Sequence, residues 1–525
     1  MSSHSSVAIV SDQRVRVSTT PPAAGTSEKH TYTQILKSTT MIGGSAAVNM
    51  AFGIVRTKAM ALFLGPAGVG LLGLYNSIAD VAHSFAGMGV QSSGVRQIAE
   101  AVGSGEAERI ARTATILRQI SIMLGLIGAA MIVVLARPIS LFTFGSAQQA
   151  WGVALLSLAV FCRLVSGGQG ALIQGMRRIS DLARMNVMAA ALGTALSIPI
   201  IYLFRERGIV PTIIAVYGVS MLTSWWYSRQ VKIERPSMAI WQIWHESGAL
   251  LKLGIAFMAS GFLTMGGSYL IRIIVLRQAG VEASGLYQAA WALGGLYVAF
   301  ILQAMGSDFY PRLTAVAKND AECNRLVNEQ AQISLLLAGP GVIGTLTLAP
   351  LIIAIFYTAK FGPAVIILRW VCLGMMLRVI AWPMGFIILA KGRQQIFLWT
   401  ELAATVVHVG LAWLLVRRFG LAGAGAAFFG LYVWHTLLIY AIVRRVSAFR
   451  WSPANRRLGL VFLPMTAFVF LSFFVLPWGG ALALGLVAVV FSSAHSLQSL
   501  VALLPPEKIP APIRLKLRRL GFRAG

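Results

Sequence analysis

The sequence predicts an all-α integral membrane protein with about fourteen transmembrane helices. Composition is the first observation behind this prediction: 57% of the 525 residues are hydrophobic, 12% are charged, and the mean hydropathy is +0.75. A soluble globule needs far more polar surface than such a chain provides. The second observation is a series of apolar runs, and the third is an internal repeat. Together they predict two similar helical bundles followed by two additional C-terminal helices.

The apolar runs follow one another along most of the chain. A helix of about 20 apolar residues spans the ~30 Å hydrocarbon core of a bilayer, and each run approaches or exceeds that length. The runs cover residues 38–62, 69–95, 117–136, 150–174, 186–204, 209–228, 253–276, 285–306, 331–357, 364–390, 396–416, 420–443, 458–476 and 481–504.

Residues 67–75 recur as residues 279–287, with six identities at a shift of 212. At that shift Gln288 matches Asn76, and at a shift of 216 Arg272 matches Arg56. The shift contains six runs, an even number, so both halves should enter the membrane in the same direction. We expect a disordered cytoplasmic tail at 1–34, a six-helix bundle at 35–230, an interfacial connector at 231–249, a second six-helix bundle at 250–445, two further helices at 446–504 and a basic cytoplasmic tail at 505–525.

The charge pattern predicts the orientation. The net charge is +27, and most of the 44 Lys and Arg residues lie in segments that share one side of the membrane if residue 1 is cytoplasmic. This asymmetry is the positive-inside pattern, and it places both termini in the cytoplasm. Because the basic residues are dispersed over loops, they indicate contact with anionic membrane lipids rather than with nucleic acid.

Several classes of chemistry lack a signal. The three cysteines, Cys162, Cys323 and Cys372, have no metal-ligand spacing, and the sequence has no Walker motif, so we expect no metal and no cofactor. A membrane glycan polymerase is expected to carry a sizeable outer loop with catalytic groups. The predicted outer loops are short, which favours a transporter over an enzyme.

The start of the first half resembles a known family. The residues that carry the resemblance are Ile35-Leu36-Lys37-Ser38-Thr39-Thr40, Gly43-Gly44-Ser45, Arg56-Thr57-Lys58 and Leu64-Gly65-Pro66-Ala67-Gly68-Val69-Gly70. They are similar to the Wzx-type O-antigen and lipid-linked oligosaccharide flippases, which are polysaccharide transporters of the multidrug/oligosaccharidyl-lipid/polysaccharide superfamily. The similarity covers residues 35–445.

This resemblance implies a V-shaped pair of bundles around a cationic central cavity. It also implies alternating access, coupled to an ion gradient, that moves an undecaprenyl-pyrophosphate-linked glycan from the cytoplasmic to the periplasmic leaflet of a bacterial inner membrane. A glycan polymerase and a chain-length regulator are the implied protein partners. The alternatives are a small-molecule or multidrug exporter of the same superfamily and, less favoured, a glycan polymerase.

Basic residues inside the predicted spans are candidates for binding the pyrophosphate. An arginine near the centre of a span costs ~2.5–3.5 kcal/mol, and its planar fork binds phosphate oxygens with two hydrogen bonds. The candidate arginines are Arg56, Arg272, Arg163, Arg369 and Arg378. Lys58 also lies within a span; for it and for Arg272, the alternative is an anchor at a helix end.

Polar side chains form a second set of candidates. Asn76, Asp80, His83, Gly87 and Gln91 recur on one helical face, where Asp80 and His83 could take up and release a proton. The alternative is a structural ion pair of Asp80 with Arg56 or His83. The cavity candidates for contact with the glycan are Asn49, Asn76, Gln91, Gln288 and Gln303. Glu401, His408 and His435 are single polar residues of the kind that usually make interhelical hydrogen bonds.

Overall fold

A computed structural model describes residues 27–231, 246–304 and 309–503, together with residues 233, 236, 238 and 241. The side chains of residues 27–43, and of several positions near the two ends of the long helix that follows the connector, lie outside the description. Most of the predicted N-terminal tail, the connector and the basic C-terminal tail therefore also lie outside the described residues, as does the side chain of Gln303. The ordered elements within the described ranges are all helices.

The first half of the chain, from α1 to α7, begins with a long helix that turns back at Gly65, where φ is 64°. Its helices are α1 (Ser27–Ala86), α2 (Val90–Ser104), α3 (Ala107–Val134), α4 (Ala136–Phe144), α5 (Ala150–Gly175), α6 (Ile179–Phe204) and α7 (Ile209–Arg229), with short 3-10 turns η1 (Ala147–Gln149) and η2 (Arg205–Gly208).

The second half, from α9 to α15, also begins with a long helix that breaks, here at Gly280, where φ is 91°. Its helices are α9 (Gly248–Ala304), α10 (Tyr310–Ala315), α11 (Asp320–Thr347), α12 (Ala349–Phe356), α13 (Ala364–Ala390), α14 (Gln394–Phe419) and α15 (Leu421–Ser447), with η4 (Ala359–Phe361). Two further helices follow, α16 (Pro453–Val475) and α17 (Trp478–Leu503).

The order of elements from α3 to α7 recurs from α11 to α15, including the short helix after the first long one and the 3-10 turn that follows. Gly65 and Gly280, at which α1 and α9 break, lie 215 residues apart, and the first residues of α6 and α14 are also 215 residues apart. The predicted register of 212 is therefore wrong near the turn. Residues 70–75 are Gly-Leu-Leu-Gly-Leu-Tyr, so an alignment by identity can be displaced by three residues. At the shift of 215 that the structure gives, the repeat equivalent of Gly285 is Gly70 rather than Gly73.

The protein is a multi-pass membrane protein. Within the described ranges, nine helical stretches are long and apolar enough to cross a membrane, or ten if the α11–α12 pair, bent by 80°, is one span. Two of the nine stretches, Gly44–Ala86 and Ile179–Arg229, have 43 and 51 residues, whereas one crossing needs about 20. A helix or a segment of one lies at each predicted apolar run. That the chain crosses the membrane fourteen times is still a prediction.

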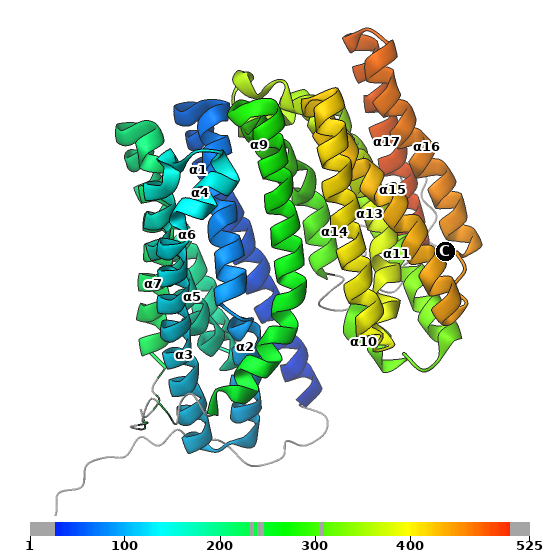
Figure 1. The fold of residues 1–525 in the computed structure, drawn as a ribbon. Helices are drawn as coiled ribbons and strands as arrows, with labels where there is room; N and C mark the ends of the chain where they lie inside the picture. The colour runs from blue at the N-terminus through cyan, green and yellow to red at the C-terminus, as the bar shows by residue number, and fades with distance from the viewer. Residues whose placement is uncertain are drawn as a thin grey trace, which may run out of the picture.

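The long broken helices α1 and α9 lie side by side at the centre of the molecule, with the remaining helices of each half on either side (Figure 1). The orange and red helices α16 and α17 lie at the outer edge of the second half and pack against α11. Glycines bring α1 and α9 into backbone contact. A Cβ added to Gly70 would lie 2.4 Å from the carbonyl oxygen of Val281, and one added to Gly285 would lie 1.8 Å from that of Pro66.

Candidate functional site

Arg272 lies at the contact between the two halves. Its Nε donates to Oε1 of Gln288 at 2.9 Å, and its Nη1 donates to Oγ of Ser77 on α1 at 2.6 Å. Gln288 belongs to the second segment of α9, after the break at Gly280, so this one guanidinium joins both segments of α9 to α1. Both acceptors are neutral, and these hydrogen bonds therefore orient the cation without cancelling its charge.

Arg56 lies beside this contact. It lines a cavity of about 300 Å³ between α1, α7 and α9, together with Asn76 and Gln288. Among the residues that the structure describes, the Arg56 side chain has no hydrogen bond or ion pair. The structure thus brings Arg56, Asn76, Gln288 and Arg272 to one region from both halves of the chain.

Arg56 and Arg272 are not strict equivalents. They are 216 residues apart, whereas the glycine breaks that follow them are 215 apart. One residue rotates a side chain by about 100° around a helix, so the two guanidinium groups point in different directions. Arg56 faces the cavity beside α7, and Arg272 faces α1.

A second cavity, of about 280 Å³, collects four predicted residues. Asp80, His83, Gln91 and Arg163 line it, between α1, α2, α5 and α9. Nη1 of Arg163 donates to Oδ1 of Asp80 in an ion pair, and the side chains of the two residues are 28% and 30% exposed. The partner of Asp80 is therefore Arg163, and not Arg56 or His83, the two partners that the structural alternative named. The two residues are 83 positions apart, and only the packing of α5 on α1 makes them neighbours.

A third cavity, of about 370 Å³, lies within the second half between α9, α13, α14 and α15. We call it the C-half cavity. Of the predicted site residues only Arg378 lines it, and the structure adds Glu401, His408 and His435, which the sequence suggested only as single polar contacts. Their spacing was the available signal: Glu401 and His408 are seven residues apart on α14 and therefore share a face.

The repeat relates the second and third cavities. The Arg163 guanidinium carbon lies 5.2 Å from the centre of the Tyr217 ring, and that of Arg378 lies 5.8 Å from the centre of the Tyr432 ring. The two arginines are 215 residues apart, and so are the two tyrosines. The two halves therefore keep an arginine–tyrosine contact at equivalent places, but only Arg163 has a carboxylate partner among the described residues.

The remaining candidates lie elsewhere. Arg369 is only 9% exposed; its Nε donates to the carbonyl oxygen of Leu346 at 3.4 Å, and its guanidinium carbon lies 3.5 Å from the centre of the Phe473 ring. It therefore faces α11 and α16 and lines none of the three cavities. Oδ1 of Asn49 is buried and has no hydrogen-bond partner within the described part of the chain.

These features define a multi-pass helical membrane protein with a duplicated fold and cationic side chains where its halves meet. The chain belongs to the polysaccharide biosynthesis protein family, to which residues 59–366 match. It is also similar to the lipid III flippases of Escherichia coli (strain K12) and Shigella flexneri. Each is 21% identical to it over 426 residues, which cover 76% of this chain and 95% of the flippase.

Solved structures share the fold. An inward-facing multidrug resistance MATE family transporter of the MOP superfamily superposes with a TM-score of 0.64 at 16% identity, covering 76% of this chain and 94% of the transporter. The lipid II flippase MurJ in an inward closed conformation gives 0.61 at 14% identity, covering 89% of this chain and all of MurJ. This chain therefore shares its fold with these two membrane proteins.

Proposed function

We propose that this protein is a flippase that moves a lipid-linked oligosaccharide from the cytoplasmic to the periplasmic leaflet of a bacterial inner membrane. The substrate is an undecaprenyl-pyrophosphate-linked glycan, such as an O-antigen or exopolysaccharide repeat unit. Membership of the polysaccharide biosynthesis family supports the glycan, and similarity to the lipid III flippase supports a lipid carrier.

The observation that carries the proposal is the positive charge between the halves. Arg56 and Arg272 lie where α1 meets α9, and within the described ranges neither is paired with a carboxylate. Burying such a cation in a membrane protein is costly, and ionisable residues inside a membrane often mark the path of a substrate or ion. A pyrophosphate offers a row of acceptor oxygens that a guanidinium fork matches.

The proposed mechanism is alternating access. Two bundles of six spans, with about fourteen spans in all and both termini in the cytoplasm, rock about the α1–α9 contact and expose the arginines to one side at a time. The pyrophosphate and the glycan cross through the protein, while the lipid tail stays in the bilayer. The Asp80–Arg163 pair is the candidate for ion coupling, since a proton on Asp80 would release Arg163.

Deletion of the gene tests this function. We expect the lipid-linked glycan to accumulate on the cytoplasmic leaflet and the surface polysaccharide to be lost, with both restored by the wild-type gene. Normal surface polysaccharide in the deletion strain would argue against the flippase. Increased sensitivity to organic cations, with normal polysaccharide, would favour the exporter alternative.

A further inference from the structure

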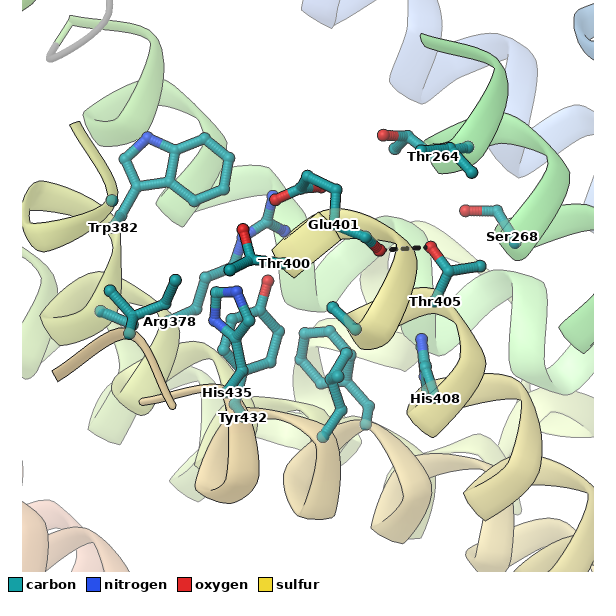
Figure 2. Close-up of a pocket in the computed structure, with 18 of the residues that line it drawn as sticks. Thr264, Ser268, Arg378, Trp382, Thr400, Glu401, Thr405, His408, Tyr432 and His435 are labelled. Atoms are coloured by element: carbon teal, nitrogen blue, oxygen red, sulfur yellow. Dashed lines mark hydrogen bonds between the residues drawn. The ribbon is translucent and has the colours of Figure 1, made fainter. Parts of the chain in front are cut away.

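The C-half cavity holds a cation and a carboxylate that are not paired with each other. Arg378 on α13 and Glu401 on α14 both line it, yet no ion pair joins them in the described structure, and the Arg378 Nε has no hydrogen-bond partner there. The Arg378 guanidinium carbon instead lies 4.8 Å from the centre of the Trp382 ring. Figure 2 shows Arg378, Trp382, Thr400, Glu401, Tyr432 and His435 gathered on one side of the cavity, with Thr264, Ser268 and His408 on the other.

Three further buried polar atoms in this cavity have no hydrogen-bond partner among the described residues. They are Nε1 of Trp382, Nε2 of His408 and Nδ1 of His435. A buried polar atom without a partner costs free energy, and native proteins leave few of them. The four residues that carry these atoms, counting Arg378, all line one cavity, which makes it a candidate ligand site.

The walls of the cavity are largely aromatic. Trp291, Trp382, Phe386, Phe397, Phe428 and Tyr432 line it. An aromatic wall with a few converging polar groups is the usual make-up of a small-molecule site, and flat ring faces suit a flat ligand with apolar C–H faces. The volume of about 370 Å³ lies at the small end of the ~300–1,000 Å³ range of such sites.

We propose that the C-half cavity binds one neutral sugar ring of the transported glycan and so contributes to glycan selection. This inference rests on the proposed flippase function. Adjacent hydroxyl groups can donate to the Glu401 carboxylate and accept from the Arg378 guanidinium, while the C–H faces of the ring pack on Trp382 or Tyr432.

The charges argue against other ligands. Glu401 disfavours the pyrophosphate, which suits Arg56 and Arg272 because Arg56 lines a cavity without a carboxylate and no ion pair joins either arginine to one among the described residues. Arg378 disfavours an organic cation in the same way. In the first half, the equivalent arginine is already paired with Asp80, so the corresponding place offers a sugar no free pair of charges. The head group and the sugar therefore occupy separate places.

Direct binding of soluble glycosides to the purified full-length protein in lipid nanodiscs tests the proposal. The probes are methyl glycosides of common hexoses and N-acetylhexosamines, observed by saturation-transfer NMR, with inorganic pyrophosphate as a second probe. We expect at least one glycoside to bind. Glu401→Gln and Trp382→Phe should each weaken that binding by about tenfold, because each removes a hydrogen-bonding group that faces the ligand. Trp399→Phe, on α14 like Glu401 but 70% exposed, is the matched control.

A cysteine probe gives a second readout on an otherwise intact site. Gly385 lines the cavity, and a Cβ added there meets no atom within 4 Å, so Gly385→Cys should fold normally once Cys162, Cys323 and Cys372 are replaced. The glycoside that binds should slow alkylation of this cysteine, and pyrophosphate should not.

The outcomes separate the two proposals. Failure of every glycoside to bind or protect, or equal binding by Glu401→Gln and wild type, overturns the sugar site, whatever the deletion strain shows. Glycoside binding with the expected losses supports the sugar site even if the deletion strain keeps its polysaccharide, in which case the flippase function is what fails.

Discussion

Lys58 and Arg277 make the same kind of contact from opposite halves of the chain. Nζ of Lys58, on α1, donates to the carbonyl oxygens of Tyr357 and, at 2.6 Å, Ala354, at the C-terminal end of α12. Arg277, on α9, donates to carbonyl oxygens at the C-terminal end of α4, namely those of Leu141 at 2.7 Å, Phe142 at 2.8 Å and Thr143 at 3.2 Å. Because α4 and α12 are equivalent helices of the repeat, each half holds the other by a cation at a helix C-terminus, where positive charge is favourable. Both contacts lie near the breaks of α1 and α9, on the side predicted to be periplasmic.

Removing these two cations should favour the outward-open state. Hydrogen bonds to a charged group contribute about 1.5–3 kcal/mol each, so Lys58→Gln or Arg277→Gln should shift the ratio of open to closed molecules by about tenfold or more. The measurement is the labelling rate of Asn76→Cys by a water-soluble thiol reagent added from the periplasmic side, in a chain without native cysteines. Lys360→Gln, an exposed lysine on the neighbouring η4, is the control. Unchanged labelling in the double variant Lys58→Gln/Arg277→Gln would refute the closing role.

The contact between Gly70 and Gly285 should tolerate no side chain in the closed state. An added Cβ would lie 2.4 Å from the Val281 oxygen in one case and 1.8 Å from the Pro66 oxygen in the other, so α1 and α9 must move apart. Overpacking of this kind usually costs about 1–3 kcal/mol. We expect Gly70→Ala and Gly285→Ala to increase the labelling of Asn76→Cys and to reduce transport. Gly53→Ala, on α1 with open space around the new Cβ, should behave as wild type. Normal transport by Gly285→Ala would contradict the close contact.

The pair of Asp80 and Arg163 should show strong coupling in a double-mutant cycle. Asp80→Asn leaves the Arg163 cation without its carboxylate, and Arg163→Gln leaves the Asp80 carboxylate without its cation. The double variant should therefore lose less thermal stability than the sum of the two single losses. The side chains are about 30% exposed, so we expect an interaction of only about 1–2 kcal/mol. Additive losses in melting temperature would show that the two charges do not stabilise each other.

Transport by the same variants separates coupling from structure. If Asp80 carries the coupled proton, the double variant regains stability but its flux no longer responds to a pH gradient. Recovery of gradient-driven flux in the double variant would assign the pair a structural role alone.

The sequence predicted the fold better than the site, for physical reasons. Apolar runs are local patterns, and a helix or a segment of one lies at each of them. Pairing across helices is not local: nothing near Asp80 in the sequence indicates Arg163. Arg369 and Arg378 lie nine residues apart on α13, which is two and a half turns, so they point to opposite faces. Because α13 is apolar on all sides, the sequence could not tell which of the two faces a cavity, and only Arg378 does.

The shift between the two halves of the repeat was also not predicted correctly from the sequence near the helix breaks. Identity matching aligned residues 67–75 with 279–287, but the breaks at Gly65 and Gly280 set the equivalence three residues further along. At the shift of 215, Arg163 and Tyr217 are equivalent to Arg378 and Tyr432, whereas at the shift of 212 they are not.

In the proposed mechanism, arginines between the halves bind the pyrophosphate of a lipid-linked glycan during flipping. The most direct test is the rate at which purified protein in proteoliposomes flips an undecaprenyl-pyrophosphate-linked oligosaccharide between leaflets. We predict flipping by the wild type and by Arg418→Ala, whose side chain is exposed outside the cavities, and a loss of at least about tenfold in Arg56→Ala and Arg272→Ala. Arg56→Lys and Arg272→Lys should recover only part of the rate, because lysine lacks the bidentate fork. Wild-type rates in folded Arg56→Ala and Arg272→Ala proteins would contradict the account.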